Sequence, residues 1–179
     1  MLQAENTILI VIDVQGKLAQ VVKEAEERLR EISILVRGVQ ALGIPVILTT
    51  QVPEKLGYSV AEVQALVPDE VEIPRTTFNV LAEPAVAERL AQCGRKQVLL
   101  CGYETHICLY QSASALLSAG YEPWLVTDAV SSRNNLDKDT ALAESRAEGV
   151  HLVSVEMALF SMLGDAGHPA FREISRSIR

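Results

Sequence analysis

The sequence predicts a single α/β domain over residues 1–179, built on a doubly wound parallel sheet with helices on both faces. Short apolar runs alternate along the chain with longer segments of helical period. The short runs are apolar on both faces, as the strands of a buried parallel sheet are. The chain has 179 residues, of which 49% are hydrophobic, so it can form one substantial core.

Five apolar runs predict strands, at residues 8–12, 46–48, 98–100, 124–126 and 152–155. A weaker strand is predicted at residues 71–74, where we expect Pro74 to end the ladder. Four longer segments predict helices, at residues 21–42, 83–93, 106–119 and 137–148, and a glycine follows each of them as a C-terminal cap. Two short helices are predicted at residues 157–163 and 170–178. This alternation indicates right-handed crossovers between parallel strands.

Composition limits the partners that we expect. The formal net charge is −7, and an acidic surface repels nucleic acid and anionic lipid, so neither is predicted as a partner. Residues 1–6 show no basic start or long apolar stretch, and the apolar run at residues 8–12 is far too short to span a membrane. Three cysteines without a CxxC pair fit a reducing compartment, so we expect a cytoplasmic protein.

Ligands of doubly wound sheets bind beyond the carboxyl ends of the strands, so the residues that leave each strand are the candidates for a site. Asp13 leaves the first strand, Gln51 follows the second, Arg75 follows the third, and the segment 102–108 follows the fourth. The sequence contains neither GxGxxG after the first strand nor GxxxxGK[ST], so we expect no nucleotide or dinucleotide cofactor.

Cys108 is the candidate nucleophile. It lies just inside a predicted helix, where the helix dipole favours a thiolate and free backbone N–H groups can bind an oxyanion. The alternative is a small buried apolar residue, the usual role of a free cysteine. Asp13 is either a general base with a raised pKa or a cap of the following turn. Cys101 and Cys93 are predicted to be structural.

Arg75 is either an exposed charge or a cation in the cleft that stabilises a thiolate and holds an anionic substrate group. His106 is two residues from Cys108 on the predicted helix, so the two side chains point to different sides. His151 and His168 are predicted to be structural. The sequence has no HxH, HExxH or DxH cluster, so no metal site is expected.

Four segments resemble a known family: ILIVIDVQ (8–15), IPRTTFNV (73–80), CGYETHICLYQSASALLSAGYE (101–122) and TDAVSSR (127–133). They are similar to the isochorismatase-like cysteine hydrolases, which include nicotinamidases and N-carbamoylsarcosine amidases. The resemblance covers nearly the whole chain, including LFSMLGDAGHPAFREIS (159–175). It implies a six-stranded parallel sheet of order 3-2-1-4-5-6 and an Asp–Lys–Cys triad.

By motif, the resemblance places the triad Asp on Asp13 and the nucleophile on Cys108. The Lys position of the family's K-x-x-F pattern falls on Arg75, and its aromatic position falls on Phe78. Arg75 keeps the positive charge but does not readily lose a proton at neutral pH. If the family's Lys only supplies charge, Arg75 can replace it. If that Lys relays a proton, turnover is impaired or depends on Asp13 alone.

The resemblance also implies a cis peptide bond between Tyr103 and Glu104. The backbone N–H groups of Glu104 and Cys108 would then form the oxyanion hole. Nicotinamidases hold a metal through a D-x-H…H cluster after the second strand, whereas residues 51–57 of this chain contain no His. No metal is therefore expected. The Q-x-P-x-x-L-G pattern of residues 51–57 resembles the isochorismatase-domain subgroup of undefined substrate.

The predicted function is hydrolysis of a small amide or a related C–N or carbonyl compound by Cys108. Isochorismatase activity on a vinyl ether is a second possibility, although such enzymes can dispense with the Cys. A binding or scaffold protein that has lost catalysis is an alternative of another class. A redox sensor would need a resolving cysteine, for which Cys101 is badly placed within a strand.

Four residues are expected by position to line the substrate pocket: Leu18, Gln51, Phe78 and Tyr103. They suggest a small, partly apolar ligand. The resemblance implies a homo-oligomer, such as a dimer or a tetramer. The apolar segment around Leu159, Phe160 and Met162 is either an interface or part of the core.

Overall fold

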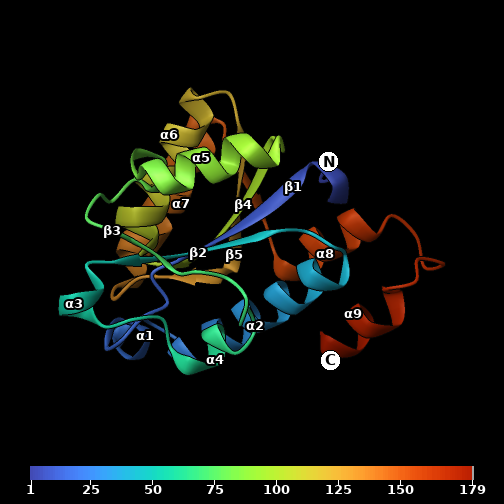
Figure 1. The fold of residues 1–179 in the computed structure, drawn as a ribbon, viewed down its shortest axis with the longest axis horizontal. Helices are drawn as coiled ribbons and strands as arrows, with labels where there is room; N and C mark the ends of the chain where they lie inside the picture. The colour runs from blue at the N-terminus through green and yellow to red at the C-terminus, as the bar shows by residue number, and fades with distance from the viewer. Residues whose placement is uncertain (179) are drawn as a thin grey trace.

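The structure is a computed structural model that describes residues 1–178, so the last residue of the predicted domain, Arg179, lies outside the described residues. Within residues 1–178 the chain forms one six-stranded sheet of order β3-β2-β1-β4-β5-β6, and all neighbouring strands are parallel (Figure 1). The strands are β1 (Thr7–Ile12), β2 (Val46–Gln51), β3 (Ile73–Arg75), β4 (Gln97–Tyr103), β5 (Glu122–Ser131) and β6 (His151–Val153). This confirms the predicted fold class and the strand order.

The helices cover both faces of the sheet (Figure 1). The α-helices are α1 (Leu18–Val21), α2 (Ala25–Ala41), α3 (Pro53–Leu56), α4 (Ala61–Gln64), α5 (Pro84–Cys93), α6 (Tyr110–Ser118), α7 (Asn135–Glu148), α8 (Val155–Leu163) and α9 (Phe171–Ser177). Two 3₁₀ turns, η1 (Ala4–Asn6) and η2 (Val80–Ala82), and a π-helical turn, η3 (Thr105–Leu109), complete the regular structure of residues 1–178. The helices α5, α6 and α7 lie on one side of the sheet, and α2, α8 and α9 lie on the other.

The core consists of two apolar layers, one on each face of the sheet. All six residues of β1 and all seven residues of β4 are buried, which explains why their sequences are apolar on both faces. Side chains alternate between the layers: Leu9 and Val11 pack toward α2, whereas Ile8, Ile10 and Ile12 pack toward α5 and α6. On α8, Leu159 and Met162 belong to the core, and Phe160 is partly exposed.

The helix predicted over residues 21–42 is wrong at its start. Two helices occupy this region, α1 and α2, and Glu24 between them has a positive φ of 55°. The break is fixed by the end of β5, because the Lys23 N–H donates to Ser132 O at 2.9 Å and Ser131 Oγ donates to Lys23 O at 2.7 Å. These contacts come from residues more than a hundred positions away, so helical periodicity does not reveal them.

The prediction that Pro74 ends the third strand is also wrong. Pro74 lies in the middle of β3 and pairs with Thr50, and the ladder continues to Arg75. Because β3 is an edge strand, only one of its sides takes part in the ladder, and a proline is tolerated there. The extra residue matters because it fixes the backbone of Arg75 beside the end of β2.

Among residues 1–178, no helix combines the length and the apolar character that a membrane crossing needs.

Candidate active site

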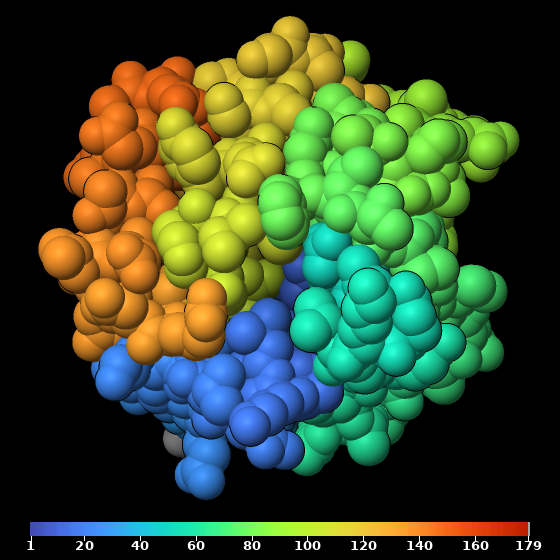
Figure 2. Space-filling model, turned by 90° about the vertical axis from the view of Figure 1, so that its left-hand side faces the viewer, coloured from blue at the N-terminus to red at the C-terminus, as the bar shows by residue number. Residues whose placement is uncertain are grey.

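The three predicted catalytic residues lie together at the carboxyl edge of the sheet. Asp13 directly follows β1, Arg75 is the last residue of β3, and Cys108 lies in η3, just after β4. All three side chains are nearly buried. Figure 2 shows this face of the molecule, with a central hollow where the blue, cyan, green and yellow-green segments of the chain meet. The sheet therefore brings these residues together although they are far apart in the sequence.

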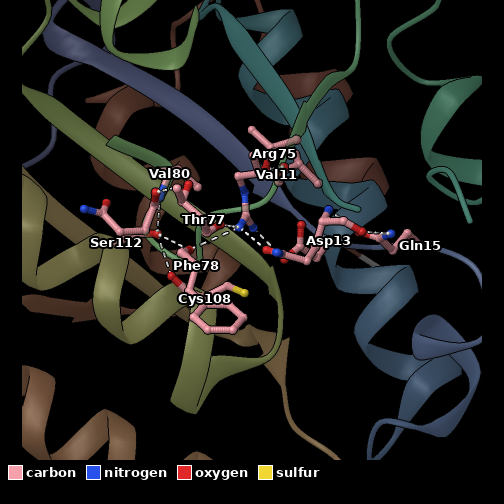
Figure 3. Close-up of polar contacts among 12 residues, drawn as sticks. Val11, Asp13, Gln15, Arg75, Thr77, Phe78, Val80, Cys108 and Ser112 are labelled. Atoms are coloured by element: carbon pink, nitrogen blue, oxygen red, sulfur yellow. Dashed lines mark hydrogen bonds and ion pairs between the residues drawn. The ribbon is translucent and has the colours of Figure 1, made fainter. Parts of the chain in front are cut away.

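Arg75 is the centre of the polar contacts at this edge. Its Nη2 donates to Asp13 Oδ2 at 2.5 Å, and the two side chains are 0% and 1% exposed. Its Nη1 donates to Gln51 Oε1 at 2.5 Å, to Phe78 O at 3.2 Å and to Thr77 O. In Figure 3 the guanidinium lies between Asp13 on one side and the Thr77–Phe78 backbone on the other. The predicted contact between Asp13 and Arg75 is present, and the guanidinium is not exposed to solvent.

The environment of the Asp13 side chain makes its charged form less favourable than it is in water. Burial raises its pKa from the ordinary value of 3.8, and the positive charge of Arg75 offsets this only in part. Its backbone adopts a positive φ of 55°, which Asp tolerates better than most residues. A carboxylate with a raised pKa at a partly desolvated strand end suits a general base.

The electrostatics of Cys108 differ from the expectation that a helix start favours a thiolate. The pKa of the Cys108 thiol is raised to about 12, chiefly by burial. The negative charge of Asp13 also raises this pKa, and by more than the positive charge of Arg75 lowers it. The turn that carries Cys108 is π-helical, and the α-helix α6 begins only at Tyr110. The free site therefore holds a neutral thiol beside a carboxylate.

The backbone around Cys108 has the form that the family resemblance implied. The peptide bond between Tyr103 and Glu104 is cis. Glu104 O accepts from the N–H groups of Ile107 and Leu109, which sets the wide first turn of η3. The Glu104 carboxylate binds Arg133, with 2.8 Å between Oε1 and Nε. The Nδ1 atom of His106 lies 2.9 Å from Ser132 Oγ, so this ring nitrogen contacts the residue after β5 and not Cys108.

The four residues expected to bind substrate are placed differently from one another. Phe78 is 50% exposed, so it can contact a ligand, and Leu18 is half-buried against the core. Gln51 is buried, and its side-chain amide is used within the protein. Tyr103 is 0% exposed and packs in the core layer of α2, so its side chain does not line a pocket. The reason is that β4 extends through Tyr103. The alternation of side chains along the strand turns the Tyr103 ring toward α2, into the core layer opposite to the one that contains Cys108.

Sequence reasoning missed two residues that support the site. Ser112 Oγ donates to Cys108 O at 2.5 Å and accepts from the Val80 N–H at 3.0 Å, so it joins η3 to the segment after Arg75. A serine four residues after a cysteine on a helix is a recognisable signal for such a bond to the backbone. The second is Gln15, whose amide binds the backbone of Gln51.

Residues 1–178 contain no group of three or more His, Cys, Asp or Glu side chains arranged to hold a metal ion. The expectation of a metal-free site stays a prediction.

Residues 7–157 match the family model of the isochorismatase domain. The chain belongs to the isochorismatase family. It is 34% identical to the secreted isochorismatase effector Isc1 of Phytophthora sojae, over 97% of this chain and 85% of that protein. It is also 34% identical to isochorismatase domain-containing protein 2 of Xenopus laevis, over 97% of this chain and 83% of that protein. Isochorismatase domain-containing protein 1 of Salmo salar is 33% identical, and the match spans 61% of its length.

Solved structures share the fold. The MAR1 ribonuclease of Caenorhabditis elegans superposes with a TM-score of 0.91 at 29% identity, covering 99% of this chain and 91% of that one. The YcaC gene product of Escherichia coli, described as an octameric hydrolase of unknown specificity, has a TM-score of 0.88 at 21% identity, covering 99% and 95%. The family relationship confirms the resemblance that the sequence motifs indicated.

Proposed function

We propose that the chain is a cysteine hydrolase of the isochorismatase family that acts on a small uncharged amide or a related C–N or carbonyl compound. The observation that carries the proposal is the meeting of Asp13, Arg75 and Cys108 at the carboxyl edge, with Arg75 bound to Asp13 and Cys108 within the electrostatic influence of both. A nucleophile beside a base can hydrolyse an amide through a covalent intermediate, and a nearby cation stabilises the charges that form.

The first step is attack by Cys108. Oδ2 of Asp13 is engaged by Arg75, and Oδ1 has no hydrogen-bond partner among residues 1–178, so Oδ1 is the oxygen placed to take the thiol proton. Because the resting thiol is neutral, the proton leaves as the sulfur–carbon bond forms. The carbonyl oxygen becomes an oxyanion, and the N–H groups of Glu104 and Cys108 stabilise it.

The second step is breakdown of the tetrahedral intermediate. Asp13 returns its proton to the leaving nitrogen, the C–N bond breaks, and an acyl-enzyme thioester remains on Cys108. A water molecule then attacks the thioester carbon and gives a proton to Asp13. The C–S bond breaks, the acid product leaves, and the proton returns to the sulfur. Arg75 stays charged throughout and keeps Asp13 in place.

Arg75 does not suit the alternative role of binding an anionic substrate group. Its two Nη atoms already donate to four oxygens, and its side chain is 0% exposed. Nε of Arg75 has no hydrogen-bond partner among residues 1–178, but it is buried as well, so a carboxylate of the substrate would have to displace protein atoms to reach the guanidinium. We therefore expect the reacting group of the substrate to be uncharged.

The proposal is tested with the variant Cys108→Ala in a screen of uncharged amides and carbamoyl compounds. We expect the wild type to release ammonia or an amine from some member of the set. The kcat of the variant should be lower by at least about a thousandfold, because the variant lacks the nucleophile. Cys93→Ala, which removes a cysteine outside the site, is the matched control and should keep full activity. Unchanged turnover by a folded Cys108→Ala protein would exclude the mechanism.

A binding or scaffold protein is the second candidate, and the observation that favours it is Arg75 in the position of the family's Lys. An arginine does not relay a proton. The variant Arg75→Lys separates the two functions on the same substrate set. Hydrolysis by the wild type supports the enzyme, and a gain of activity only in Arg75→Lys supports a protein that has lost catalysis through this substitution.

A further inference from the structure

Both polar groups of the Gln51 side chain are engaged within the protein. Its Oε1 accepts from Arg75 Nη1 at 2.5 Å, and its Nε2 donates to Thr76 O at 2.7 Å. The residue is buried, so both contacts are shielded from water. An amide that is engaged at both ends holds its neighbours rather than a substrate.

The backbone of Gln51 is itself held by the side chain of Gln15. Gln15 Oε1 accepts from the Gln51 N–H at 2.7 Å, and Gln15 Nε2 donates to Gln51 O at 2.9 Å and to Gly57 O at 2.6 Å. Gln15 lies two residues after Asp13 and is 0% exposed. The contacts therefore form a closed ring that runs from Asp13 through Arg75, Gln51 and Gln15 back to Asp13 along the chain.

We propose that Gln51, anchored by Gln15, is a positioning residue that holds the Arg75 guanidinium on Asp13. The proposal rests on the proposed function. It also assigns a role to Gln15, the last residue of the ILIVIDVQ segment, which takes no part in the reaction steps. Asp13 supplies the chemistry, and Gln15 fixes the strand end that orients the cation facing it.

The geometry of arginine explains why an acceptor is needed at position 51. Nη1 and Nη2 are held rigidly apart in one plane, so an acceptor on Nη1 determines where Nη2 points. The carbonyl oxygens of Thr77 and Phe78 bind Nη1 from the segment that follows Arg75, whereas Gln51 Oε1 binds it from the neighbouring strand β2. Without this second anchor the guanidinium can turn toward the loop and away from Asp13.

The test is the variant Gln51→Met, which keeps the length of the side chain and removes both hydrogen bonds. We expect kcat to fall about tenfold while KM stays within about twofold of the wild type, since a charge-assisted hydrogen bond that orients the cation is lost. The pKa of Asp13, measured by NMR of ¹³C-labelled aspartate, should rise because Arg75 lowers it. Gln40→Met removes an exposed amide that also binds a backbone carbonyl and is the matched control.

Three results would overturn the proposal. A rise in KM with unchanged kcat would make Gln51 a substrate contact. A loss of stability with an unchanged Asp13 pKa would make its role structural only. An unchanged pKa and unchanged kcat would remove any role. If Gln51→Met does not fold, Gln51→Asn, whose shorter amide does not reach Arg75, carries the same expectations. The NMR measurement needs no substrate, so it tests positioning even if the proposed hydrolysis fails.

Discussion

At the scale of single residues, the site holds a neutral thiol beside a buried carboxylate, and the free protein does not hold a thiolate. Burial is the largest cause of the raised pKa of both Asp13 and Cys108. Arg75 opposes it for both groups, because a nearby positive charge favours their charged forms. In the proposed mechanism Asp13 removes the proton of Cys108 during attack, so the ionised form of Asp13 is the active one.

This arrangement predicts the acid side of the pH–rate profile. Asp13 must be ionised to act as a base, so kcat/KM should fall as the pH drops through its raised pKa, above the ordinary value of 3.8. The variant Arg75→Gln removes the charge that lowers this pKa, so its acid limb should lie at a higher pH than that of the wild type. Arg30→Gln, at an exposed position, is the control and should not move the limb. A limb at the same pH in both variants would contradict the role of Asp13 as the base.

The residues of the site could be predicted to different degrees. That Asp13, Arg75 and Cys108 lie together could be predicted, because each comes at or just after the end of a strand of a parallel sheet, and the carboxyl ends of such strands share one edge. Tyr103 was placed wrongly because the last residues of β4 continue the alternation of the strand. The role of Gln51 depends on side-chain contacts with Arg75 and Thr76, which no local pattern encodes.

At the scale of elements, the junction of β4 and η3 depends on Gly102. Its φ is 116°, and a Cβ on this residue would lie 1.9 Å from Ile12 O on the neighbouring strand. Gly102 also marks the point where the pairing of β4 with β5 shifts its register. The close approach of β1 and β4 places Asp13 and the Cys108 turn side by side.

Gly102→Ala should therefore destabilise the protein strongly. The positive φ and the overlap with Ile12 O should together lower the free energy of unfolding by about 3 kcal/mol or more, measured by urea denaturation. Gly43→Ala is the matched control, because Gly43 has a φ of 67° with nothing within 4 Å of the added Cβ. The control should cost only about 1 kcal/mol. Equal losses in the two variants would show that the contact with Ile12 is not limiting.

Element boundaries could be predicted where local sequence sets them, but not where distant contacts do. The helix starting at Pro84 and its glycine stop at Gly94 lie close to the predicted bounds, because capping is local. The break between α1 and α2 was not predictable in this way, since Ser131 and Ser132 impose it from the end of β5. Likewise, the π-helical turn of η3 replaces the α-helical start that was expected at Cys108.

At the scale of the whole molecule, the sheet order was predictable only through the family resemblance. Strand–helix alternation indicated a doubly wound sheet, but several strand orders satisfy it. The homo-oligomer and the cytoplasmic location stay predictions. Of the C-terminal segment that offered an interface, Leu159 and Met162 are buried in the core, and Phe160 is left as the exposed residue.

Because two thiols are buried, the stability of the whole fold should decrease at alkaline pH. The pKa of Cys108 is raised to about 12 and that of Cys101 is raised as well, both by burial. A thiol whose pKa is higher in the folded state than in the unfolded state stabilises the fold. This stabilisation is complete below the unfolded pKa of 9.0 and is lost as the pH rises toward the folded pKa. Unfolded thiols lose protons in this range while folded ones keep them, so alkali favours unfolding.

Between about pH 8 and pH 10, each of these thiols should lower the free energy of unfolding by about 1 kcal/mol. Urea denaturation at both pH values should therefore show a smaller alkaline loss in Cys108→Ala than in the wild type, and a smaller loss again in Cys101→Ala/Cys108→Ala. The comparison uses the change with pH within each variant, so the cost of the cavity that alanine leaves cancels. An identical alkaline loss in all three proteins would show that these thiols do not stay protonated in the folded state.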